Sequence, residues 1–172
     1  MTFDRELPLA LAAAAEAEYE YDDGDGVDFE PYEAFLSADD TTSWIRSWTG
    51  NGELTGEEFL VFGQDGTGGF AALWLIRPGA DLVSQPVVFL GSEGDTGVVA
   101  RDVAAYLWLL ADGYGPFEAV ESPGGRNPRP HEELLAIAER YAPGGRRSAE
   151  DVIAEAAREF PDFQETIEAL CR

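Results

Sequence analysis

Three apolar runs near the middle of the chain, at residues 59–62, 70–76 and 87–90, most constrain how it can fold. Such unbroken runs leave no polar side for solvent, so they are typical of strands buried on both faces of a sheet. The first two runs flank the polar segment QDGTGG at residues 64–69, whose glycines supply the positive φ that a hairpin connection requires. Pro86 precedes the third run, where a missing backbone N–H is tolerated. We therefore expect three strands at the centre of a domain.

Helices are predicted on both sides of these strands. Asp39 or Asp40, Asp95 or Thr96, and Ser148 have the side chains expected of N-caps. Gly113, Gly115 and Pro116 are expected to stop the helix that follows the strands. The predicted helices span residues 6–19, then from Asp39 or Asp40 through Trp48, then 98–111, 131–142, from Ser148 to Pro161, and from Asp162 through Leu170.

The segments FLVFGQDGTGGFAALWLI (residues 59–76) and PVVFLGSEG (residues 86–94) resemble the signature of the SUKH superfamily. This superfamily includes yeast regulators of cell-wall synthesis and many bacterial immunity proteins. The match extends over roughly residues 40–112, and its signature consists of core and turn residues, so it identifies a scaffold that can carry several functions.

The resemblance and the pattern of elements imply an α+β fold with a central, mostly antiparallel sheet flanked by helices. We expect a SUKH-like domain at residues 1–121. Residues 122–130 read as a linker because they are rich in Pro and Gly. Residues 122–172 lie outside the match and are expected to form a C-terminal helical extension packed on the same domain, giving a single domain overall.

The chain has 34 acidic residues against 11 basic ones, and its formal net charge is −23. Residues 1–60 hold sixteen of the acidic residues and only two arginines. This field repels phosphates, so it argues against nucleic acid and against anionic membrane as direct partners. It would steer a basic protein partner into contact. The alternative is that the acidity serves solubility alone.

The sequence carries no targeting or membrane signal that we recognise. Its first residues, MTFDREL, lack the basic and apolar regions of a signal peptide, and no apolar span of 18 residues occurs. Cys171 stands alone and so has no partner for an internal disulfide. We expect a soluble, cytoplasmic protein.

Motifs for catalysis and metal binding are incomplete. His131 is the only histidine, and the zinc pattern His-Glu-x-x-His fails because Leu135 stands at its last position. The acidic loop at residues 22–28 fails as an EF-hand because Tyr21 and Tyr32 occupy the first and last ligand positions. The triplet Asp95-Thr96-Gly97 follows a polar turn, unlike that of aspartic proteases. We therefore expect no enzyme activity, no catalytic residues, no metal and no cofactor.

The resemblance implies a non-catalytic immunity-type protein that neutralises a cognate bacterial toxin, for instance a nuclease, by occluding it. The alternative is an intracellular regulatory or scaffold protein of the same fold without a toxin partner. Five aromatic residues of the N-terminal third are interleaved with acids: Tyr19, Tyr21, Phe29, Tyr32 and Phe35. They could anchor a basic partner surface, or they could pack on the sheet edge. The expected partner-binding residues are Tyr19, Tyr21, Asp22, Asp23, Asp25, Asp28, Phe29, Tyr32, Asp39 and Asp40.

Overall fold

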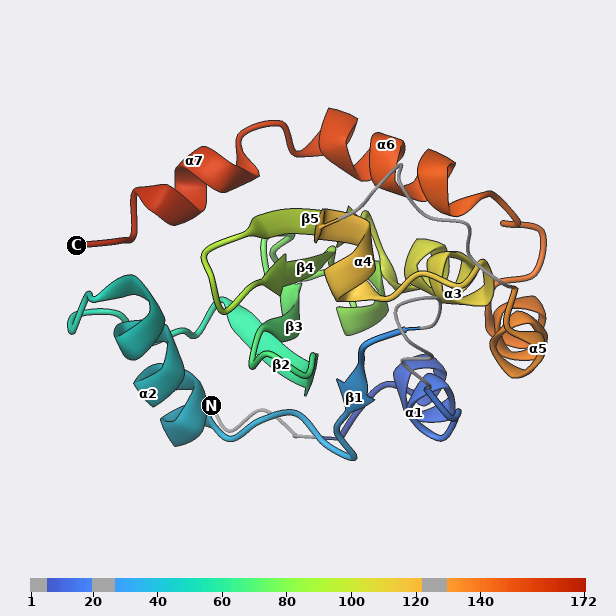
Figure 1. The fold of residues 1–172 in the computed structure, drawn as a ribbon, viewed down its shortest axis with the longest axis horizontal. Helices are drawn as coiled ribbons and strands as arrows, with labels where there is room; N and C mark the ends of the chain where they lie inside the picture. The colour runs from blue at the N-terminus through green and yellow to red at the C-terminus, as the bar shows by residue number, and fades with distance from the viewer. Residues whose placement is uncertain (1–5, 20–26, 122–129) are drawn as a thin grey trace.

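The chain forms an α+β fold around a five-stranded antiparallel sheet whose strands lie side by side in sequence order. The computed structural model describes residues 6–19, 27–121 and 130–172 (Figure 1). The predicted strands are confirmed, and each pairs with the next along the chain. The strands are β1 Glu30–Pro31, β2 Phe59–Gln64, β3 Phe70–Trp74, β4 Val87–Leu90 and β5 Thr96–Ala100.

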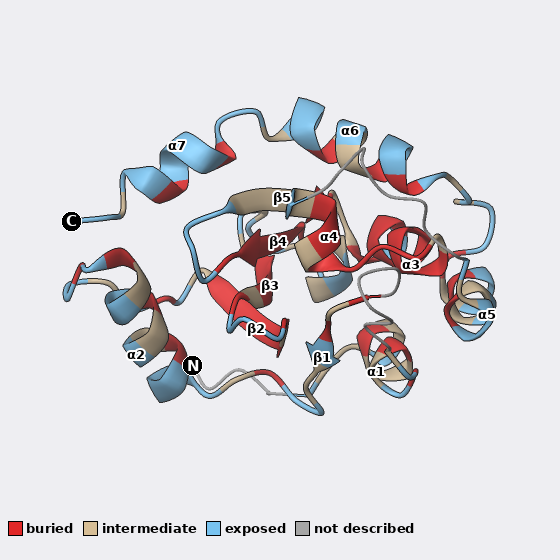
Figure 2. Cartoon of the chain, viewed as in Figure 1, coloured by how far each residue is buried: buried red, intermediate tan, exposed pale blue. Residues whose placement is uncertain are grey.

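Both faces of the sheet are buried, as the apolar runs predict. Alternate residues point to opposite faces, so Leu60 and Phe62 of β2 enter one apolar cluster while Phe59 and Val61 enter another. In Figure 2 the central strands are buried along nearly their whole length, between helical layers that expose only their outer sides.

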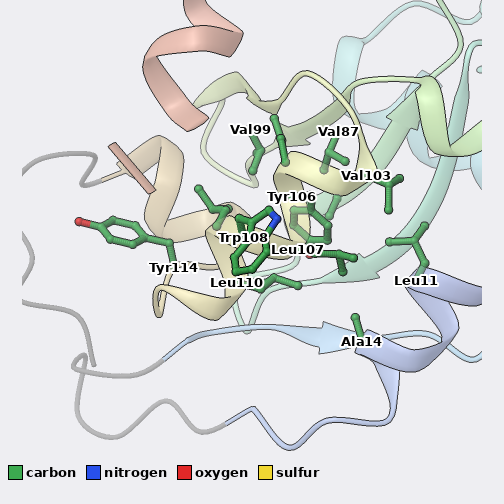
Figure 3. Packing of buried hydrophobic residues seen from close by; sticks show 14 of the residues in the cluster. Leu11, Ala14, Val87, Val99, Val103, Tyr106, Leu107, Trp108, Leu110 and Tyr114 are labelled. Atoms are coloured by element: carbon green, nitrogen blue, oxygen red, sulfur yellow. The ribbon is translucent and has the colours of Figure 1, made fainter. Parts of the chain in front are cut away.

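The larger apolar cluster lies on the face covered by α1, α3, α4 and α5. Helix α3 is buried almost all round, and its residues Tyr106 and Leu107 fill the centre of this cluster (Figure 3). Helix α5 packs on α3, and α1 packs on both. These helices are α1 Leu9–Ala15, α3 Val103–Ala111, α4 Pro116–Glu121 and α5 Glu132–Tyr141.

The opposite face carries a smaller cluster beneath α2 and α7. Ile45 of α2 and Ile167 of α7 are buried there, and the Phe163 ring lies 4.9 Å from the Trp74 ring. Helix α6 runs along the edge strand β5 and joins the two layers (Figure 1). These helices are α2 Ala38–Thr49, α6 Ala149–Glu159 and α7 Phe163–Glu168.

Two predicted helix starts are wrong. Residues 96–100 form β5, so neither Asp95 nor Thr96 caps a helix; the N-cap of α3 is Asp102, whose carboxylate accepts a hydrogen bond from the Ala105 N–H at 2.8 Å. The turn before β5 closes with a hydrogen bond from the Gly91 N–H to the Asp95 carbonyl at 2.7 Å, and it returns the chain antiparallel to β4. This pairing with β4 outweighs the local preference for a helix.

The first turn of α2 also differs from expectation. Ser37, two or three residues before the expected caps, accepts a hydrogen bond from the Asp40 N–H, so Asp39 and Asp40 occupy the first turn. Carboxylates in the first turn stabilise the helix because they lie near the positive end of its dipole. Gly50 ends α2 in the left-handed conformation, with φ of 70°.

The C-terminal helices agree more closely with the sequence. Ser148 caps α6 by accepting from the Asp151 N–H, and His131 caps α5 through its Nδ1. Asp162 occupies the N-cap position of α7 but makes no side-chain capping bond. The linker expected at 122–130 falls largely outside the described residues. None of the described helices has the length and apolar character needed to cross a bilayer.

Candidate functional site

A groove with a volume of about 620 Å³ opens between α2, α7 and the turns that connect β2 to β3 and β4 to β5. Ligand sites in proteins generally have volumes of roughly 300–1,000 Å³, so this groove has room for several side chains of a partner. It lies over the sheet face with the smaller apolar cluster. Its lining comprises Trp44, Ser47, Trp48, Gly68, Ser92, Glu93, Gly94, Thr96, Gln164, Ile167, Glu168 and Cys171.

Helix α2 supplies two half-buried tryptophans, Trp44 and Trp48, which lie one turn apart on the same side. Ile45 between them is fully buried and anchors the helix on the sheet. The Trp48 indole N–H donates to the Gly91 carbonyl at 2.7 Å, which fixes that ring against the β4–β5 turn. The Trp44 ring lies 4.8 Å from the Phe70 ring, and its N–H makes no hydrogen bond within the described residues. One wall of the groove is thus aromatic.

The opposite wall, α7, is held near α2 by hydrogen bonds at and just beyond the C-terminal ends of the two helices. The Asn51 side-chain amide donates to the Leu170 carbonyl at 2.9 Å, and the Arg172 N–H donates to the Thr49 carbonyl at 2.9 Å. These bonds join segments about 120 residues apart in the sequence.

The β2–β3 turn beside the groove is held by a buried carboxylate. Asp65 is 2% exposed, and its Oδ1 accepts hydrogen bonds from the Gly69 N–H at 2.7 Å and the Thr67 N–H at 3.1 Å. The Thr67 hydroxyl lies 3.0 Å from that of Ser92 and links this turn to the β4–β5 turn. Asp65 therefore shapes the rim without entering the groove.

The groove is electrostatically negative. Glu93 and Glu168 line it, and none of its lining residues is basic. Past Glu93 it adjoins a hollow of about 120 Å³ where Asp95 and Glu121 meet. The hydrogen bond between these two carboxyls raises the pKa of Glu121, with repulsion from the Asp95 and Glu93 charges adding to the effect. This end of the molecule therefore attracts cationic groups.

The sequence-predicted partner residues do not form one patch. Asp39 and Asp40 are exposed at the start of α2, whereas Asp28 accepts from the Gly66 N–H at 2.8 Å and so holds the β2–β3 turn. Phe29 and Phe35 are buried in the larger cluster, so they pack inward and offer no contact surface. The predicted residues Tyr21, Asp22, Asp23 and Asp25 lie outside the described residues.

The two remaining tyrosines serve internal contacts. The Tyr19 hydroxyl donates to the Ala14 carbonyl at 2.8 Å, and burial, followed by the nearby Glu133 charge, raises its pKa. The Tyr32 hydroxyl donates to Gln64 Oε1 at 2.7 Å, and partial burial followed by the Glu30 charge raises its pKa. Both hydroxyls are thus used inside the molecule, and neither tyrosine lines the groove.

His131 has a structural position. Its Nδ1 accepts from the Leu134 N–H at 3.2 Å, and its Nε2 lies 2.9 Å from the Glu18 carbonyl, so both ring nitrogens are engaged. Within residues 6–19, 27–121 and 130–172, no three His, Cys, Asp or Glu side chains are grouped as metal ligands would be.

Trp44, Trp48, Glu93 and Glu168 line the groove, and the sequence analysis named none of them as a partner-binding residue. No family model, curated protein or solved structure matches the chain. The likeness to SUKH proteins therefore rests on the motifs at residues 59–94 and stays a prediction.

Proposed function

We propose that this protein is a non-catalytic binding protein that neutralises a partner protein by covering the surface on which the partner's activity depends. The observation that carries the proposal is the groove between α2 and α7, with tryptophans in its wall and carboxylates at its rim. The resemblance to bacterial immunity proteins supplies the biological setting, in which a toxin is blocked in the cytoplasm of the cell that makes it.

Two physical properties of the groove favour a basic protein as the ligand. Half-buried tryptophans offer apolar area at little cost in side-chain entropy, and such residues dominate the binding energy of protein interfaces. Carboxylates around them accelerate encounter with a positively charged surface and repel acidic competitors. In a nuclease the positive surface is the one that holds nucleic acid, so covering it blocks activity.

The test is complex formation with the secreted protein encoded by a neighbouring gene, measured by calorimetry and by survival of cells that express that protein. We expect a stoichiometric complex and rescued growth. Reversal of charge at Glu93 and Glu168 to arginine should weaken the complex, while the same change at Glu132 and Glu139, exposed on α5 far from the groove, should not. The proposal is refuted if no such neighbour forms a complex with the protein and growth is not rescued in any case.

A further inference from the structure

The protein holds one of its own arginines between an aromatic ring and a carboxylate. The Arg77 guanidinium carbon lies 5.6 Å from the centre of the Phe160 ring, and its Nη2 is ion-paired with Glu159. The Arg77 Nη1 also donates to the Arg101 carbonyl at 2.9 Å. A planar, weakly hydrated guanidinium suits this arrangement because it can stack on a ring and still direct its N–H groups at a carboxylate.

The groove offers the same two chemical groups without a cation between them. Trp44 is half-buried in its wall, and its indole N–H has no hydrogen-bond partner in the described chain. Glu168 accepts one hydrogen bond, from Gln164 at 3.1 Å, and no arginine among residues 6–19, 27–121 and 130–172 pairs with Glu168 or Glu93. These carboxylates therefore retain acceptor sites for an incoming donor.

We propose that the groove receives an arginine side chain from an extended segment of the partner, with the guanidinium against Trp44 and its N–H groups directed at Glu93 and Glu168. This inference rests on the proposed function and adds the chemistry of the contact. Arginine is favoured over lysine because a compact, strongly hydrated ammonium has no plane to stack and only one point of charge. The volume of about 620 Å³ also accommodates the residues on either side of the arginine.

The experiment uses the full chain and three blocked peptides, Gly-Ala-Xaa-Ala-Xaa-Ala-Gly, in which Xaa is arginine, lysine or citrulline. Citrulline keeps the shape of arginine and removes its charge. Binding is measured by calorimetry at about 20 mM salt, where surface electrostatics is weakly screened, and the site is located from the NMR signals of the indole N–H groups. We expect the arginine peptide to bind, the lysine peptide to bind about threefold more weakly, and the citrulline peptide at least about tenfold more weakly.

Three variants test the location. The double variant Glu93→Gln, Glu168→Gln should weaken the arginine peptide about fivefold, and Trp44→Leu about threefold. The double variant Glu132→Gln, Glu139→Gln, which removes the same charge from exposed positions on α5, should leave affinity within about a factor of 1.5. Because Glu93 and Glu168 are exposed, their variant folds normally and remains informative if Trp44→Leu does not fold.

Equal binding of the arginine and lysine peptides, with equal loss in both double variants, would mean general attraction to the negative protein and would overturn the inference. Absence of binding by the arginine peptide would also overturn it. A partner complex that is insensitive to Glu93→Gln, Glu168→Gln would leave the proposed function in place and refute the groove as its contact. Groove binding of the arginine peptide, without any partner complex, would support the groove chemistry and refute the proposed function.

Discussion

Replacement of Asp65 by alanine should destabilise the fold by about 2–3 kcal/mol. This carboxylate is 2% exposed and sits in the β2–β3 turn, where it accepts hydrogen bonds from the Gly69 and Thr67 N–H groups. The Thr67 hydroxyl is a third donor, at 2.9 Å. The turn therefore depends on an acceptor that alanine cannot replace.

The magnitude follows from where each donor lies. Gly69 is buried, so its N–H would lose a charged acceptor and gain no water, at a cost of about 1.5–3 kcal/mol. Thr67 is exposed, so its N–H and hydroxyl would be rehydrated, and their loss adds less than about 1 kcal/mol. Asp65→Asn keeps one acceptor oxygen without the charge, so we expect it to cost about 1 kcal/mol.

Urea unfolding followed by tryptophan fluorescence measures both variants. With a slope of about 2 kcal/mol per molar urea, the midpoint of Asp65→Ala should fall by about 1–1.5 M. Asp81→Ala is the matched control, because Asp81 is exposed and makes no capping bond, and it should change stability by less than about 0.5 kcal/mol. A loss below about 1 kcal/mol in Asp65→Ala, or equal losses in the alanine and asparagine variants, would refute the reasoning.

Three further predictions concern other parts of the molecule. Tyr106→Phe should be neutral or stabilising by up to about 1 kcal/mol in urea unfolding, because the buried Tyr106 hydroxyl has no hydrogen-bond partner in the described chain; a clear loss of stability would contradict this. Ile167→Ala should cost about 2–4 kcal/mol, because this residue is 2% exposed and pins α7 to the sheet; a cost below about 1 kcal/mol would show that α7 is loosely held. Glu121→Gln should raise the melting temperature at neutral pH and lose that advantage in acid. The raised pKa of Glu121 means that the folded protein binds this proton more tightly than the unfolded chain, so stability falls as pH rises through the two pKa values, and glutamine removes the fall; parallel pH profiles for the two proteins would contradict this.

The sequence predicted the central strands because their signal is local. Residues 59–62 and 87–90 are apolar at every position, and a sheet covered on both faces is the arrangement that accommodates them. Thr96–Ala100 was assigned in part to a helix because Val99 and Val103 also satisfy helical spacing. The deciding interaction is the ladder with β4, which propensity within one segment does not report.

The groove was not predictable for a similar reason. Trp44 and Trp48 have the spacing of core residues, and Ile45 between them is indeed buried. Their partial exposure depends on how far α7 covers the same face, and α7 arrives more than 110 residues later in the chain. The groove carboxylates Glu93 and Glu168 come from two segments that are far apart in the sequence, and neither lies in the acidic N-terminal third of the chain.

The apolar residues are divided unequally between the two faces of the sheet, so the larger part of the core and the groove lie on opposite faces. Most of the buried apolar residues lie beneath α1, α3 and α5 in the larger cluster, and the groove belongs to the side with fewer of them. Substitution of the exposed groove residues Glu93 and Glu168 should therefore cost little folding free energy. Such exposed positions can change during evolution while the buried scaffold stays as it is.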